Sequence, residues 1–101
     1  MQYEISVERI IGEVAKAGIA QAEDLLDRKT KRKELRQIAM ELSYRYSNYK
    51  QKEIGSIFGV DYSTVSQSRA RLKIKLKSSR KLKKKFHRLL EQIDKLSISK
   101  I

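Results

Sequence analysis

The stretch KQKEIGSIFGVDYSTVSQSRARL, which spans Lys50–Leu72, decides the fold. Its first part predicts a short helix over residues 50–58, and the next three residues leave room only for a tight turn before a second helix. Two helices joined so closely must cross at short distance, which requires a small side chain near the crossing. Gly55 supplies that small side chain, and Gly59 stands at the turn. The spacing predicts a helix-turn-helix over residues 50–77.

The second helix of this motif begins with short polar side chains and continues with positive charge. Asp61 or Ser63 is expected to cap it, and apolar side chains at helical spacing are expected to face inward. Short hydroxyl and amide groups suit base edges in the major groove of DNA, and longer cations suit the flanking phosphates. A pair of helices whose only role is to pack within the fold would need neither the short polar groups nor the cations. The pattern therefore favours DNA binding through Ser63, Thr64, Ser66, Gln67, Arg69 and Arg71.

Composition restricts the class of protein. The chain has 101 residues, no proline, no cysteine and 4 glycines, which predicts one all-α domain without disulfides or thiolate metal sites. No apolar run approaches the ~18 residues of a membrane span, and the first residues do not resemble a signal peptide. We expect a cytoplasmic, nucleoid-associated protein that does not bind membranes.

The positive charge is concentrated in the later part of the chain. Residues 1–27 hold six acidic and two basic residues, a net charge of −4, and the remainder holds twenty-two basic and six acidic residues, a net of +16; the two sum to +12. No acidic residue lies between Asp61 and Glu91. A solubilising surface usually mixes the two signs, so this bias indicates a polyanionic partner, with nucleic acid the first candidate and an anionic membrane the second.

Two helices are expected near the N-terminus. Ser6 is a suitable cap for the first, and Gly18 is expected to end it by adopting the left-handed conformation. A short helix over Ala22–Leu26 follows, and then a basic run that starts at Arg28.

The next helix is expected to be capped by Thr30 and to reach about Tyr46. Its inward stripe has three- and four-residue spacing. Tyr44, Tyr46 and Tyr49 are interpreted as core or half-buried packing residues, with a base-stacking platform as the alternative.

The last helix is located by a break in helical phase. The apolar stripe is interrupted at Ser78-Ser79 and restarts at Leu82, which predicts a helix from about Ser79 to Leu96 that packs back onto the domain. The tail from Ser97 to Ile101 is expected to be frayed. The chain is thus divided into a DNA-binding region, residues 1–77, and a basic C-terminal helix with its tail, residues 78–101.

No pattern in the chain predicts catalysis. There is no phosphate-binding loop of the G-x-x-x-x-G-K-[ST] type, and His87 is the single histidine. The acidic residues form no cluster. We expect neither an enzyme nor a bound metal, cofactor or small-molecule substrate.

RKTKRKELRQIAMELSYRY, residues 28–46, followed by KEIGSIFGVDYSTVSQ, residues 52–67, resembles the C-terminal DNA-binding domain of the bacterial replication initiator DnaA. The shared marks are the basic loop, RQIAM, E-I-G-x-x-F-G and D-x-S-T-V, and the resemblance covers about residues 5 to 75. The lysine-rich part that follows is similar to the version of this domain attached to some REP-associated tyrosine transposases. The resemblance implies a compact domain with a Trp-repressor-like helix-turn-helix and, here, one additional C-terminal helix.

The same resemblance implies roles for individual residues. Arg28 would enter the minor groove, Arg36 and nearby cations would hold phosphates, and Ser63 and Thr64 would face the major groove. Tyr62 stands where the family usually has histidine. The full set of expected DNA contacts is Arg28, Lys29, Lys31, Arg32, Arg36, Lys52, Tyr62, Ser63, Thr64, Ser66, Gln67, Arg69 and Arg71.

The expected function is sequence-specific binding of double-stranded DNA by a monomer, as a replication-initiator or transposase-associated module that is free-standing or part of a larger chain or complex. A free-standing transcriptional regulator is the first alternative. RNA binding is a second, although the deep, narrow major groove of RNA does not admit a helix. Binding to anionic membranes through the basic amphipathic segment Arg69–Leu96 is a third.

Overall fold

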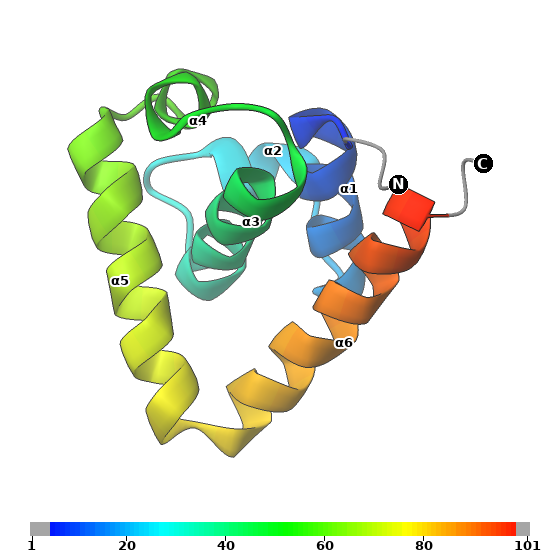
Figure 1. The fold of residues 1–101 in the computed structure, drawn as a ribbon. Coiled ribbons are helices and arrows are strands. Elements are labelled where there is room, and N and C mark those ends of the chain that lie inside the picture. Colours follow the sequence, from blue (N-terminus) through cyan, green and yellow to red (C-terminus); the bar gives the residue numbers. More distant parts are fainter. Residues whose placement is uncertain (1–4, 99–101) are drawn as a thin grey trace.

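In the computed structural model, which describes residues 5–98, the chain forms six helices and, within that range, no strand (Figure 1). The all-α prediction is therefore confirmed. The helices are α1 Val7–Ala17, α2 Ala22–Leu26, α3 Lys33–Tyr46, α4 Gln51–Phe58, α5 Tyr62–Ser78 and α6 Arg80–Ile98.

Helix α3 lies in the middle of the molecule, and α5 and α6 diverge from a corner at Ser79 to pass on either side of it (Figure 1). One continuous apolar core joins these helices to α1, α2 and α4. Helix α6 contributes four fully or almost fully buried side chains to that core, Leu82, Phe86, Leu89 and Ile93. Its apolar stripe is thus used within the domain.

Helix α1 begins as expected, but the backbone conformation at its end differs from the predicted one. The Ser6 hydroxyl accepts a hydrogen bond from the Arg9 backbone N–H at 3.2 Å. Gly18 follows the helix with φ −93°, so the predicted left-handed conformation is wrong, and Ile19 has the positive φ of 54° instead. A Cβ at Gly18 would meet the end of the Leu35 side chain, which would have to shift to make room for it.

Two other expected helix boundaries are corrected. Thr30 does not cap α3; its hydroxyl accepts a hydrogen bond from the Arg32 N–H at 3.0 Å and orders the loop, and the helix begins only at Lys33. Helix α6 continues to Ile98, so Ser97 and Ile98 belong to a helix and not to a frayed tail. Residues 99–101 lie outside the described part of the chain.

The turn between α4 and α5 is closely packed. Gly59 ends α4 in the left-handed conformation, φ 74°, which glycine adopts at little cost. The Asp61 carboxylate caps α5 by accepting a hydrogen bond from the Thr64 N–H at 2.9 Å. This bond, and then the one from the Thr64 hydroxyl, hold the pKa of Asp61 below its ordinary value. Of the two expected caps, Asp61 is the correct one.

Gly55 and Gly12 give a matched test of this packing. A Cβ on Gly55 would lie 2.6 Å from the Val60 carbonyl oxygen, whereas one on Gly12 would meet nothing within 4 Å. We expect Gly55→Ala to lower the free energy of unfolding by about 1–3 kcal/mol, because backbone must move. Gly12→Ala should raise it by roughly 0.5–1 kcal/mol, because alanine favours a helix interior. Urea unfolding followed by circular dichroism measures both; an unchanged Gly55→Ala protein would contradict the close crossing.

Candidate nucleic-acid interface

One face of α5 is exposed over several turns. Val65 and Leu72 are buried on the inner side, and the outer side carries small and polar side chains at three- and four-residue spacing. Four of these are exposed and hold no hydrogen bond or ion pair to another described side chain: Ser63, Ser66, Gln67 and Ala70. We call these four residues the outer face of α5. Three had been predicted as DNA contacts.

The outer face continues into residues that the sequence analysis left out. Ala70, the last of the four, was not among the predicted contacts, and Ile74, 67% exposed, lies one turn beyond it. Their spacing from Ser63, Ser66 and Gln67 could have indicated them. Apolar groups on such a face suit the methyl group of thymine.

Thr64, in contrast, is part of the helix cap. Its hydroxyl donates to the Asp61 carboxylate at 2.8 Å, and the side chain is partly buried. Its single hydroxyl proton is therefore already used within the protein. This geometry favours a role in positioning the start of α5 over the predicted contact with a base.

Arg69 is turned inward. Its Nε donates to Glu41 Oε1 at 2.6 Å and its Nη1 to Gln51 Oε1 at 2.7 Å. The guanidinium also lies 3.7 Å from the centre of the Tyr44 ring. The predicted phosphate contact does not fit this arrangement, because the guanidinium is bound to groups on α3 and α4. Arg71, two residues later, is exposed as expected.

The phosphate contact predicted for Arg36 does not fit the structure either. It is buried, and its guanidinium donates to the carbonyl oxygens of Leu25 at 2.7 Å and Phe58 at 2.9 Å. Burial, and then the positive charge of Arg28, lower the pKa of Arg36 from its ordinary value, while Asp27 acts in the opposite direction. The predicted phosphate contact is replaced by an internal one, because those carbonyls lie at the ends of α2 and α4 and accept both donors.

The basic loop between α2 and α3 lies beside the start of α5. Arg28 lines a shallow pocket with residues of α4, the turn and α5, namely Ser56, Gly59, Val60, Asp61 and Thr64. The loop is ordered from within, since Asp27 accepts a hydrogen bond from the Lys29 N–H at 3.0 Å. Its other predicted contacts are exposed as well: Lys29, Lys31 and Arg32.

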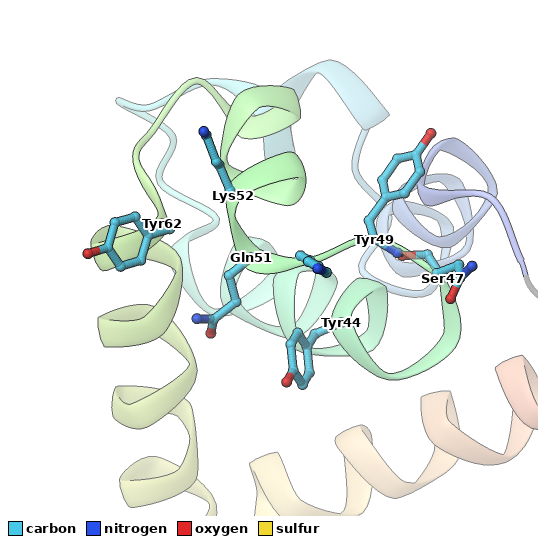
Figure 2. Close-up of a pocket in the computed structure, with 8 residues that line it drawn as sticks. Tyr44, Ser47, Tyr49, Gln51, Lys52 and Tyr62 are labelled. Carbon is cyan, nitrogen blue, oxygen red and sulfur yellow. The ribbon is translucent and has the colours of Figure 1, made fainter.

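A second, open pocket lies where the chain passes from α3 to α4 (Figure 2), and we call it the tyrosine pocket because Tyr44, Tyr49 and Tyr62 line it. Figure 2 shows Gln51 between Tyr44 and Tyr62, and Lys52 on the neighbouring part of α4. Tyr44, Tyr49 and Tyr62 are 44%, 43% and 60% exposed, so the first two are not core residues, although about half of each is covered. Tyr46 is half-buried as expected, with its hydroxyl 3.4 Å from Asp94.

The structure thus brings together the outer face of α5, the basic loop and the tyrosine pocket, with Lys52 and Tyr62 at the edge of that pocket. This surface presents hydrogen-bonding groups and cations from three segments of the chain. Within residues 5–98, no cluster of three or more metal-ligating side chains occurs. None of the helices in that range is apolar over a length sufficient to cross a membrane.

Comparison with known proteins adds no relative: no protein-family model matches the chain, and no curated protein matches it.

Lysine substitutions at Arg36 and, as a control, at Arg32 test whether the buried hydrogen bonds of Arg36 stabilise the fold. Replacing Arg36 by lysine keeps the charge but leaves at least one of the two buried carbonyls without its donor. We expect Arg36→Lys to lower the free energy of unfolding by about 1–3 kcal/mol. The control Arg32→Lys, on the exposed loop, should change it by less than about 0.5 kcal/mol. Equal stability of both variants in urea unfolding would show that the Arg36 hydrogen bonds are not structural.

Arg69 and Arg71 give a second matched pair on one helix. Arg69→Gln removes a donor from the buried Glu41 carboxylate, so we expect the free energy of unfolding to fall by about 1–3 kcal/mol. Arg71→Gln removes the same charge from an exposed position and should change it by less than about 0.5 kcal/mol. Thermal and urea unfolding of the two proteins measure the difference, and a larger loss for Arg71→Gln would contradict the described contacts.

Proposed function

We propose that the chain is a sequence-specific double-stranded DNA-binding domain in which α4 and α5 form a helix-turn-helix. The observation on which the proposal rests is the outer face of α5, which is exposed over about two turns, carries mostly small and polar side chains, and borders a basic loop. A major groove about 12 Å wide admits a helix with such a face. The resemblance of the sequence to the DnaA C-terminal domain supports the same conclusion.

In this proposal Ser63 and Gln67 read base edges. The amide of Gln67 suits the paired donor and acceptor that adenine offers in the major groove, and the methyl group of Ala70 suits thymine. Arg71 at the end of the outer face and Lys52 near the start of α4 would hold phosphates on either side.

The basic loop provides the second contact. Arg28 lies beside the α4–α5 turn, so a duplex seated on α5 would pass close to it. A long cation beside a recognition helix suits the narrow, electronegative minor groove. Lys29, Lys31 and Arg32 would then contact the neighbouring phosphates. The chain acts in this proposal as a nucleoid-associated binding module, without catalysis of its own, in replication initiation, transposition or transcription.

Single-stranded nucleic acid is a second candidate, and the tyrosine pocket favours it. Exposed aromatic rings beside lysines stack on unpaired bases. One of the three rings, that of Tyr44, is covered on one face by Arg69, which leaves Tyr49 and Tyr62 for stacking. Competition between a duplex and its separate strands discriminates the two functions: stronger competition by single strands would favour the second.

Variants of Gln67 and Arg32 test whether the first residue contacts bases and the second contacts phosphates. Duplexes selected from a random pool at moderate salt first define the preferred site. We expect Gln67→Ala to reduce the affinity ratio between that site and mixed-sequence duplex by about tenfold, because a base contact is lost. Arg32→Ala should weaken binding to all duplexes alike and lower the log–log salt slope by about one.

Fluorescence anisotropy across a salt series measures both quantities. The absence of any enriched site would reduce the proposal to nonspecific DNA binding. Equal loss of sequence preference in the two variants would overturn the assigned roles.

A further inference from the structure

Helix α6 has a second basic surface that the proposed function does not use. A groove between α6 and the end of α1 is lined by four cations together with Ala17, Leu89 and Gln92. The cations are Lys81, Lys84, Lys85 and Arg88, and we call them the α6 basic row. Within residues 5–98, no carboxylate lines the groove, and all four side chains are exposed.

The α6 basic row is unfavourable for the isolated domain. Lys84 and Lys85 are each three or four residues from both Lys81 and Arg88, so like charges adjoin one another on the helix surface. Each such pair destabilises a helix by roughly 0.2–0.5 kcal/mol. The first turn of α6 contains no acidic residue, although negative charge is favoured at that end of a helix. None of the four takes part in the ion pairs found among residues 5–98. An anionic partner would remove this repulsion.

The shape of the row suits a nucleic-acid backbone. From Lys81 to Arg88 the helix rises about 10 Å, which along a duplex corresponds to about three successive phosphates of one strand. A membrane surface would require an apolar face beside the cations. Four apolar side chains of α6 are instead buried in the core and two more, Leu90 and Leu96, are partly buried against it. Among the described residues, no exposed aromatic ring lines the groove for stacking on unpaired bases.

The row and the outer face of α5 lie on different helices. Helices α5 and α6 lie on opposite sides of α3 (Figure 1), and the groove is bordered by α6 and the end of α1. No residue of α5 lines the groove, so the row is a surface separate from the outer face of α5. The described molecule is 37 × 31 × 23 Å, which leaves room for two duplexes on different sides.

We infer that the α6 basic row binds the phosphate backbone of a second segment of duplex DNA, so that one domain holds two segments together. The inference rests on the proposed function for the first segment, bound by α5. Recognition at the row is by charge and spacing, without reading of sequence. The two duplex segments held in this way are parts of one looped DNA molecule or of two separate DNA molecules.

The test compares two variants of the full chain that lose the same charges. The first replaces the row by glutamine at Lys81, Lys84, Lys85 and Arg88. The control replaces three other exposed lysines and one arginine by glutamine at Lys73, Lys77, Arg80 and Lys83. Each variant changes three lysines and one arginine, so both fall from a net charge of +12 to +8 (12 − 4).

Two measurements are made on each protein. Anisotropy gives the affinity for one duplex that contains the selected site. A bridging assay then measures how much of a fluorescent, mixed-sequence duplex the protein recruits to beads that carry the selected duplex. We expect the row variant to bind the single duplex within about threefold of the control but to recruit at least about tenfold less of the second duplex.

Each other outcome overturns the inference in a distinct way. Equal recruitment by the two variants would show that only net charge matters, or that a dimer bridges through two copies of α5. A wild-type protein that binds one duplex and recruits no second would refute the second site and leave the proposed function intact. Loss of all duplex binding would refute both. Recruitment of duplex RNA or phosphatidylserine vesicles in preference to duplex DNA, abolished in the row variant, would refute DNA as the partner.

Discussion

The buried guanidinium of Arg36 fixes the part of the structure from which the candidate interface is built. It lies on α3 and donates to the last turn of α2 through Leu25 and of α4 through Phe58. Carbonyls at helix ends have no partner within their own helix, and positive charge is favoured there. One side chain therefore satisfies two helix ends and sets the distance between the basic loop, which follows α2, and the turn, which follows α4. The ring of Phe58, 5.3 Å from the guanidinium, adds an apolar contact.

A second internal contact fixes α5 against α3. The almost fully buried Glu41 carboxylate accepts from Arg45 and Arg69, both at 2.6 Å, so its two oxygens have one arginine each. Breaking such a pair would leave a buried charge without a partner, which costs more than the pair contributes. Because Arg69 also binds Gln51, the same network holds the start of α4. The orientation of the outer face of α5 follows from this arrangement and not from the turn alone.

Local features of the sequence were sufficient for most of the fold. The helices follow from three- and four-residue spacing, and the caps at Ser6 and Asp61 are local hydrogen bonds that residue type predicts well. Two local expectations were wrong. Ile19 has the positive φ that was expected of Gly18, and the Thr30 hydroxyl accepts from the N–H of Arg32, within the basic loop, in place of capping α3.

The candidate site was predicted less completely, for a physical reason. Residue type alone does not distinguish an exposed arginine from one that binds inside the protein. The partners of Arg36 are 11 and 22 residues away, and the Glu41 partner of Arg69 is 28 residues away. The exposure of Tyr44 and Tyr49 likewise depends on how the chain passes from α3 to α4. Each of these depends on contacts between helices, which periodicity does not encode.

Two arginines of this chain make internal contacts that suit the chemistry of the guanidinium group. The planar guanidinium offers several donors in fixed directions, and Arg36 and Arg69 each use it to bind two acceptors at once. The lysines of the basic loop and of the α6 basic row remain exposed, where a hydrated point charge on a flexible stem is favoured. In the proposed complex this separation has a consequence for affinity. The internal arginines would hold the loop and α5 in place before a duplex arrives, so binding would order only long surface side chains, and less of the interaction free energy would be lost to ordering.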